Sequence, residues 1–286
     1  MEQVHPVPDH VVDVAMTAIV RPVFLVGCAR SGTSILGEVI AAHPRVTYLY
    51  EASGIWNRLL PGRPDHRLTA ADATAGIAAR VRAELSERLA EPARDILVEK
   101  NPKHALRVSF LDAIFPDCRI IHLIRDGRDT AASLMFRNRG PEWGHLKIPG
   151  WEDLMGRYPG ANHIRCAHQW RDSVSIARAE GRAMSPQLNL PRYFEVVYED
   201  LIRRPEAAVG AILEFLGLPF ATEVRAILPR LQDSTRGSYH ARRQVRHYVD
   251  NHAHRIGRFR ENLTPGQIDE VTAVCGDLLR ELGYAD

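Results

Sequence analysis

Glycines, hydroxyl side chains and one arginine lie close together near the amino-terminal end of the sequence. Gly27 and Gly32 are separated by four residues, Arg30 lies between them, and Thr33 and Ser34 follow directly. In such a turn, backbone N–H groups and the positive end of the next helix can surround one anion of phosphate size. A loop that binds a nucleoside triphosphate would carry lysine at the position of Thr33. The sequence therefore predicts a loop for a single phosphate-sized group and disfavours a triphosphate.

A second group of anion-binding side chains follows a later apolar run. Arg125 comes directly after this run, and Ser133 and Arg137 are four residues apart on a predicted helix, so they share one face. Two guanidinium groups and a hydroxyl beside a helix start are typical of a phosphate pocket. The charged residues between them are expected to pair with one another and to hold the loop without chemistry of their own: Asp126, Arg128 and Asp129.

Both groups must be positioned by the strands that precede them. Continuous apolar runs predict strands over residues 23–26, 46–50, 96–98, 119–124 and 193–198. Helical periodicity predicts helices over residues 35–42, 69–89, 104–115, 129–136, 162–179, 206–216, 222–231 and 265–282. This alternation predicts an α/β fold with a parallel sheet, whose ligands bind at the carboxyl edge.

Length and composition describe an ordinary globular chain. Its 286 residues fit one large domain, and no linker, repeat or low-complexity tract divides them, so we expect a single domain over 1–286 with a partly ordered leader, 1–20. The formal net charge of +2 favours neither nucleic acid nor a membrane surface. No segment resembles a secretion signal or a transmembrane span, and the four cysteines lack paired spacing. These features predict a cytoplasmic protein.

Arginines and histidines are interleaved through residues 234–261. Their spacing matches no strong metal-ligand pattern, and aromatic residues are too few to stack regularly on nucleic acid. We therefore predict no metal site and no nucleic-acid partner. We interpret the segment as a basic lid over an anionic ligand.

Five short segments, taken in order, resemble the motifs of one enzyme family. They are GCARSGTS at 27–34, VEKNP at 98–102, RDGRDTAAS at 125–133, VVYEDL at 196–201, and GRFRENL at 257–263 followed by a helix ending in LGY. Together they resemble the sulfotransferases that use 3′-phosphoadenosine 5′-phosphosulfate (PAPS). The resemblance extends from about residue 22 to residue 284. It implies the sulfotransferase fold, a three-layer α/β fold with a central parallel sheet similar to that of P-loop nucleotide hydrolases.

The resemblance also implies which residues bind the donor. The first loop would hold the 5′-phosphosulfate through Arg30, Ser31, Gly32, Thr33 and Ser34. The second segment would hold the 3′-phosphate through Arg125, Ser133 and Arg137. Tyr198 would lie near the adenine, and Arg258 would close over the nucleotide. No metal ion would be required, because arginine and lysine supply the positive charge.

Three residues would carry the chemistry that the resemblance implies. The number of residues between Arg30 and Glu51 resembles the spacing between the loop arginine and the catalytic glutamate in the protein-tyrosine sulfotransferase branch. Lys100 matches the lysine that contacts the leaving oxygen, and Arg30 would also stabilise the developing charge. His104 is the alternative base. Without these roles, Glu51 would be a solvated carboxylate or a partner of Arg30, and Lys100 would pair with Glu99.

The resemblance implies an enzyme that transfers a sulfuryl group from PAPS to a hydroxyl or amine and releases adenosine 3′,5′-bisphosphate. The acceptor would be a small molecule, a glycan or a lipid, selected by residues 52–68, 138–160 and 232–256. The sequence is compatible with a homodimer. Two other functions stay open: a small-molecule kinase using ATP, which Thr33 disfavours, and a nucleotide-binding protein without catalytic activity.

Overall fold

A central sheet of five parallel strands organises the chain. The computed structural model describes residues 21–59, 61–89, 94–137, 146–185, 191–232 and 252–284, apart from the side chains of residues 136 and 137. The order across the sheet is β2-β3-β1-β4-β5, and every neighbouring pair is parallel, which confirms the predicted sheet. The predicted leader lies outside the described residues. The strands are β1 (Val23–Val26), β2 (Val46–Tyr50), β3 (Ile96–Lys100), β4 (Arg119–Ile124) and β5 (Tyr193–Val197).

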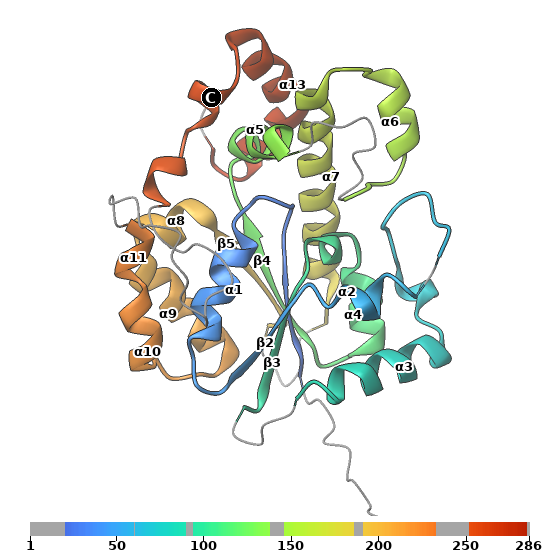
Figure 1. Ribbon diagram of the computed structural model, residues 1–286, viewed down its shortest axis with the longest axis vertical. Coiled ribbons are helices and arrows are strands. Elements are labelled where there is room, and N and C mark those ends of the chain that lie inside the picture. The colour runs from blue at the N-terminus through green and yellow to red at the C-terminus, as the bar shows by residue number, and fades with distance from the viewer. Residues whose placement is uncertain are drawn as a thin grey trace, which may run out of the picture.

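Helices cover both faces of this sheet and give the predicted three layers (Figure 1). The α-helices of the described residues are α1 (Thr33–Ala41), α2 (Ser53–Trp56), α3 (Ala75–Ser86), α4 (Val108–Ile114), α5 (Gly127–Arg137), α6 (Trp151–Arg157), α7 (Asn162–Ala183), α8 (Tyr198–Arg203), α9 (Pro205–Leu216), α10 (Thr222–Ile227), α11 (Pro229–Gln232), α12 (Phe259–Asn262) and α13 (Pro265–Glu281). Three 3-10 helices are η1 (Ala70–Asp72), η2 (Pro102–Leu106) and η3 (Ala253–Arg255). Within the described ranges, every helix is too short or too polar to cross a bilayer.

Alternate side chains of β1 enter two different cores. Val23 and Leu25 belong to the core shared with α1 and α9, whereas Phe24 and Val26 belong to the core shared with α3 and α4. A strand that is covered on both faces needs apolar residues at every position. This requirement explains the continuous apolar run at the centre of the sheet.

Three of the predicted helices are divided in the structure, and the helix expected over 222–231 becomes α10 followed by α11. The helix expected over 69–89 becomes η1 and α3, because Thr69 forms a capping box with Asp72 and Thr74 caps a new helix start. The helix expected over 104–115 becomes η2 followed by α4. Periodicity identifies the buried face of such segments, but it does not detect a turn that keeps the same face buried.

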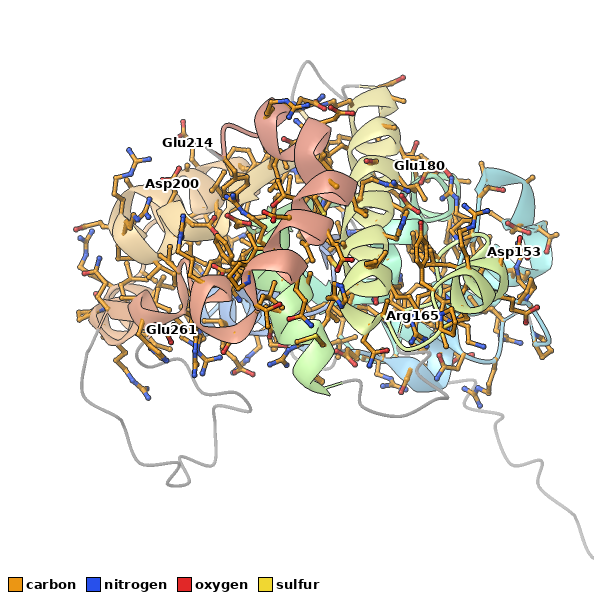
Figure 2. All side chains as sticks on the ribbon, turned by 90° about the horizontal axis from the view of Figure 1, so that it is seen from above. Asp153, Arg165, Glu180, Asp200, Glu214 and Glu261 are labelled. Atoms are coloured by element: carbon orange, nitrogen blue, oxygen red, sulfur yellow. The ribbon has the colours of Figure 1, made fainter. Side chains whose placement is uncertain are left out.

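The C-terminal helix α13 packs against α5 and α7 above the carboxyl edge of the sheet (Figures 1 and 2). Thr264 caps this helix in a capping box with Gln267, and Pro265 occupies its first position. Val271 and Leu279 are buried in the core that α13 shares with α7. The C-terminal part of the chain is therefore fixed next to the loops that follow the strands.

Candidate active site

The candidate residues follow the strands directly. Glu51 comes after β2, Lys100 ends β3, the loop of residues 27–32 follows β1, and Arg125 follows β4. Because parallel strands end at the same edge of a sheet, these positions converge. The ladder between β2 and β3 extends one residue further, since the Glu51 N–H donates to the Lys100 carbonyl at 2.8 Å. The backbone itself therefore aligns the two predicted catalytic residues.

The loop after β1 has the backbone of an anion-binding turn. Gly32 has a φ of 99°, and a Cβ at this position would lie 2.7 Å from the Tyr198 ring, so the loop requires glycine here. No described side chain caps the first turn of α1, and its later N–H groups bond the Gly32 carbonyl, which leaves the Thr33 and Ser34 N–H groups available to a ligand. Ser31 and Thr33 are buried and Ser34 is half-buried at this helix start. Their contact with a phosphosulfate stays a prediction.

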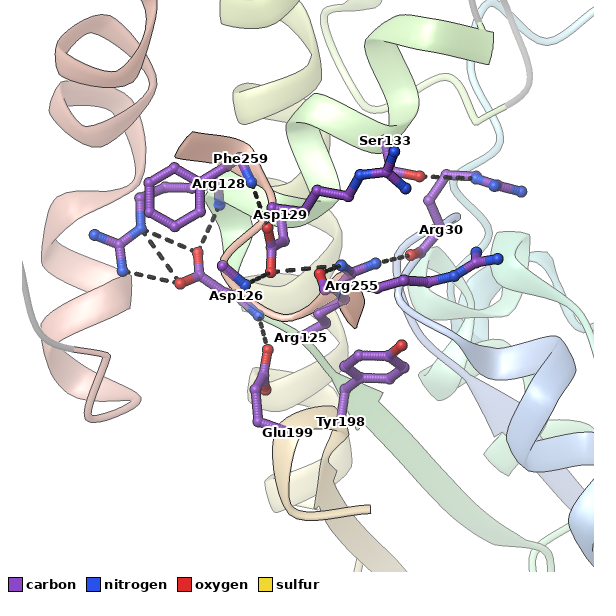
Figure 3. Close-up of polar contacts among 12 residues, drawn as sticks. Arg30, Arg125, Asp126, Arg128, Asp129, Ser133, Tyr198, Glu199, Arg255 and Phe259 are labelled. Carbon is purple, nitrogen blue, oxygen red and sulfur yellow. Dashed lines mark hydrogen bonds and ion pairs between the residues drawn. The ribbon is translucent and has the colours of Figure 1, made fainter. Parts of the chain in front are cut away.

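A cleft of about 610 Å³ joins this loop to the second predicted anion site. It brings together four predicted donor-binding residues, and Arg30 Nε donates to Ser133 Oγ at 3.2 Å (Figure 3). The side chain of Arg137 lies outside the described residues. The lining consists of Arg30, Arg125, Asp129, Ser133, Arg255, Arg258 and Asn262. Of these, Asp129 and Asn262 were not predicted to bind a ligand, whereas Arg255 belongs to the segment interpreted as a basic lid.

The Arg125 guanidinium connects the segments around the cleft (Figure 3). It donates to the Arg30 carbonyl at 3.3 Å and to the Arg255 carbonyl at 2.5 Å, and it lies 3.4 Å from Asp129. It also lies over the Tyr198 ring, 4.7 Å from the ring centroid. A planar guanidinium held in this way is preorganised for an anion in the cleft that it lines.

Asp129 anchors the segment that carries Arg255 and Arg258. Its two carboxylate oxygens accept hydrogen bonds from the Gly257 and Phe259 N–H groups, both at 2.8 Å. Burial raises the pKa of Asp129, while the neighbouring guanidinium and these N–H groups oppose the shift. Spacing gave no signal for this role, because the partners are 128 and 130 residues away in the sequence.

The predicted pairing among the charged residues of the second segment is correct only in part. Arg128 Nη2 lies 2.8 Å from Asp126 Oδ2, as predicted. Asp129 instead contacts Arg125 and backbone N–H groups, so its predicted pairing with the other two is wrong. The Arg128 guanidinium lies over the Phe259 ring, 4.7 Å from the centroid. Asp126 thus binds Arg128 within the loop, whereas Asp129 binds Arg125 and the C-terminal segment.

A buried carboxylate also ties the C-terminal LGY motif to the sheet. The Tyr284 hydroxyl donates to Glu199 Oε2 at 2.7 Å, and the Asp126 N–H donates to Glu199 Oε1 at 3.1 Å. Burial raises the pKa of Glu199, and these hydrogen bonds oppose the shift. Glu199 therefore joins the chain end to the turns that follow β4 and β5.

Tyr198 is the first residue of α8, whereas the sequence predicted it as the end of a strand. It is 1% exposed, its ring contacts Gly32, and its hydroxyl lies 3.0 Å from His252 Nδ1. Burial raises the pKa of Tyr198 to about 12. Tyr198 therefore supports the first loop through packing, and its location near an adenine stays a prediction.

Glu51 and Lys100 form an ion pair in which Nζ and Oε1 are 2.6 Å apart. The Lys100 side chain is fully buried, with its ammonium 3.6 Å from the centroid of the Tyr50 ring, whereas the Glu51 side chain is 27% exposed. Burial lowers the pKa of Lys100, and the charge and hydrogen bond of Glu51 oppose this shift. Lys100 thus pairs with Glu51 and not with Glu99, the alternative that the sequence left open, because consecutive strand residues point to opposite faces.

Glu51 and Arg30 both have a left-handed backbone, with φ values of 43° and 74°. Residues other than glycine rarely adopt this conformation, and those that do are concentrated at functional sites. Among the described residues, one other non-glycine residue has a positive φ, Arg21 before β1, at 61°. Two of these three positions are therefore the predicted base and the predicted loop arginine.

The predicted alternative base, His104, is fully enclosed. The Trp56 and Phe24 rings meet it edge-on at centroid distances of 4.5 and 5.6 Å, and its Nε2 lies 2.8 Å from Glu99 Oε2. Glu99 in turn accepts from the Ala52 N–H and the Trp56 indole N–H, both at 3.1 Å. Burial lowers the pKa of His104. His104 has no surface at which an acceptor could bind, and it supports the turn after β2.

The chain is similar to known proteins over most of its length. Residues 22–222 match the model of the "Sulfotransferase family". The nodulation protein NoeE of Sinorhizobium fredii is 28% identical over 287 residues, covering 91% of this chain and 65% of NoeE. Protein-tyrosine sulfotransferase 2 of Gallus gallus is 28% identical over 215 residues, covering 71% of this chain and 52% of the relative. The chain thus spans about half to two thirds of the length of these two relatives.

Solved structures share the fold. The sulfotransferase domain from the curacin biosynthetic pathway has a TM-score of 0.58 and 16% identity, covering 92% of this chain and 98% of that domain. Mouse sulfotransferase SULT7A1, solved in complex with PAP, has a TM-score of 0.51 and 18% identity, covering 93% of this chain and 89% of that chain. These likenesses confirm the predicted fold. Because the family model also matches residues 22–222, this chain belongs to the sulfotransferase family.

Proposed function

We propose that the chain transfers a sulfuryl group from PAPS to a hydroxyl or amine of a small-molecule, glycan or lipid acceptor. The observation that carries this proposal is the cleft in which the loop after β1 meets Ser133 and Arg125. β1 pairs with β3 on one side and with β4 on the other. Its loop therefore lies between the strand that ends in Lys100 and the strand that leads to Arg125.

PAPS suits this cleft because it carries two separate anionic groups, on the 3′ and 5′ positions of its ribose. The loop after β1 supplies N–H groups for the 5′-phosphosulfate, and Arg125, Ser133 and Arg258 supply donors for the 3′-phosphate. Thr33, in place of a lysine, makes the loop less suited to ATP. The complex of mouse SULT7A1 with PAP, a protein of the same fold, supports the choice of donor.

In the proposed reaction, Glu51 accepts the proton of the acceptor hydroxyl or amine while the acceptor oxygen or nitrogen attacks the sulfur. A new bond to sulfur forms, and the bond from sulfur to the bridging oxygen of the donor breaks. Negative charge develops on that bridging oxygen, where Lys100 stabilises it, and Arg30 stabilises the sulfuryl oxygens. The partly exposed carboxylate of Glu51 beside the buried ammonium of Lys100 supports this division of roles.

The test is a calorimetric titration with adenosine 3′,5′-bisphosphate, with ATP and magnesium titrated in parallel. We expect micromolar binding of the bisphosphate and no measurable binding of ATP. Arg30→Ala should weaken bisphosphate binding, because this side chain bonds Ser133 across the cleft. Binding of ATP in preference to the bisphosphate would overturn the proposal in favour of a kinase. Turnover is then followed with radiolabelled PAPS against a panel of acceptors.

A further inference from the structure

A second pocket, of about 250 Å³, lies beyond the turn that follows β2. Most of its lining comes from residues 56–68, within the segment expected to select the acceptor. Its volume is below the range of about 300–1,000 Å³ that is usual for whole ligands, so it suits one end of a molecule. We name it the Arg107 pocket; it is lined by Trp56, Asn57, Pro61, Gly62, Arg63, Asp65, His66, Leu68, Lys103 and Arg107.

Arg107 is a buried cation without an acidic partner among the described residues. It is 5% exposed, its Nε donates to the His66 carbonyl at 2.9 Å, and its Nη1 has no hydrogen-bond partner in the described part of the chain. Burial lowers the pKa of Arg107 to about 10, with the charge of Glu99 opposing the shift, so the group stays charged at neutral pH. Buried guanidinium groups are normally paired, because an unpaired one is destabilising.

The rest of the lining is also positive. Lys103 is half-buried, and its Nζ bonds the neutral Asn57 oxygen at 3.3 Å. Arg63 adds a third cation, which pairs with Asp72 outside the pocket. Against these three cations, the lining contains one carboxylate, Asp65. An anion would therefore find two positive groups, at residues 103 and 107, that no described carboxylate neutralises by an ion pair.

The pocket adjoins the proposed catalytic pair. Trp56 lines it and donates its indole N–H to Glu99 Oε1, which also accepts from the N–H of Ala52, the residue directly after Glu51. Lys103, which lines the pocket, lies three residues after Lys100 in the sequence, and burial and the charge of Arg107 lower its pKa while the charge of Glu51 opposes the shift. The donor cleft is lined by other residues, which lie in the loop after β1, in the turn after β4, on α5 and in the C-terminal segment. The Arg107 pocket is thus separate from the donor cleft and next to the residues that would meet the acceptor.

We propose that the Arg107 pocket binds an anionic oxygen group of the acceptor, a carboxylate, phosphate or sulfate, while the acceptor hydroxyl meets Glu51. This inference rests on the proposed function, because it takes the molecule at Glu51 to be the sulfuryl acceptor. The unpartnered Nη1 of Arg107 and the ammonium of Lys103 are the donors. The substrate class that follows is an acidic alcohol, phenol or amine.

Protection of Lys103 against chemical labelling tests the site without any turnover. The chain has three lysines, at positions 100, 103 and 147, so an amine reagent followed by peptide mass spectrometry resolves each one. Inorganic sulfate is titrated against chloride at constant ionic strength. We expect sulfate to slow the labelling of Lys103 saturably by about tenfold, and Arg107→Met to remove this protection. Arg58→Met, an exposed arginine paired with Glu84 outside the pocket, is the control and should keep it.

Two outcomes would overturn the anion site: no protection in the wild-type chain, or equal protection in Arg107→Met. Arg63→Met, at a more exposed position, is the second variant if Arg107→Met does not fold, and it should lose part of the protection. Bisphosphate binding is measured on the same samples. If it is absent, the proposed function fails, whereas its presence without Lys103 protection means that only this inference fails.

A panel of acceptors tests whether the anion in the Arg107 pocket is part of the acceptor molecule or a free ion. Alcohols and phenols that carry a carboxylate or phosphate are compared with their esters or unphosphorylated forms, using labelled PAPS. We expect the acidic members to be preferred by the wild-type enzyme, and Arg107→Met to reduce that preference about tenfold. Equal use of acidic and neutral members would show that the pocket takes a free ion and would overturn the acceptor assignment.

Discussion

The two sides of β1 hold their charged side chains in different ways. On the β4 side, the cleft arginines depend on Asp129 and on backbone carbonyls contributed by segments up to 130 residues apart. On the β2 and β3 side, the ion pair of Glu51 and Lys100 depends on a backbone ladder and on buried groups between residues 46 and 104. The proposed donor site thus requires the C-terminal part of the chain, whereas the proposed base and the lysine at the leaving oxygen come from one contiguous stretch.

The largest effect should come from a change in the pair of Glu51 and Lys100, on the β2 and β3 side. We expect Glu51→Gln to lower kcat by roughly 10²–10⁴, because the proposed base is lost while the amide keeps the shape of the side chain. Bisphosphate affinity should not change, since the cleft is lined by other residues. Steady-state kinetics and calorimetry measure the two quantities, and Glu84→Gln, a partly buried and ion-paired acid outside both sites, is the matched control. A variant with wild-type kcat would remove Glu51 from the mechanism.

The next largest effect should be on the free energy of unfolding, through the contacts that join the C-terminal segment to the β4 side. Tyr284→Phe removes the hydroxyl that donates to the buried Glu199 carboxylate. We expect the free energy of unfolding to fall by about 1–3 kcal/mol, because a buried acceptor loses its partner. Urea denaturation measures the change, and kcat per folded molecule should stay near the wild-type value. A large loss of kcat in the folded variant would mean that the two sides are coupled.

Asp129→Asn should weaken bisphosphate binding about tenfold. Two effects of this change oppose each other: the removal of a negative charge from an anion cleft favours binding, and the loss of one of two backbone anchors disfavours it. We expect the loss of the anchor to dominate. Asp126→Asn removes the same charge without touching that anchor and is the control. Tighter binding by Asp129→Asn would show that the anchor is not needed.

The smallest effect should appear in the pH profile. Lys100 must be protonated to stabilise the leaving oxygen, so kcat should fall as pH rises through its lowered pKa. Tyr50→Leu removes the ring that favours the charged form, which lowers this pKa further. The alkaline limb should then begin about 0.5–1 pH unit lower. Tyr50→Phe keeps the ring and should match the wild type; a shift in this variant too would exclude the ring contact as the cause.

The sheet and its strand-end residues could be predicted because apolar runs covered on both faces are easy to recognise, and ligands collect at the carboxyl edge of parallel strands. The pairing of Glu51 with Lys100 could not, because it requires that β2 and β3 be neighbours, which no local pattern reveals. The same holds for Asp129, whose partners lie in the C-terminal segment. The unpartnered Nη1 of Arg107 becomes visible only when burial and hydrogen bonds are known together.

The hydrogen bond from the Glu51 N–H to the Lys100 carbonyl has a consequence for the diversification of such enzymes. Because strand pairing and the Trp56 anchor to Glu99 fix the proposed catalytic pair, the segment from residue 57 to residue 69 can change its length and composition without moving that pair. New acceptors could then be recruited by exchanging this one loop on an unchanged scaffold. A loop graft from a related chain would be a direct route to an enzyme of altered selectivity.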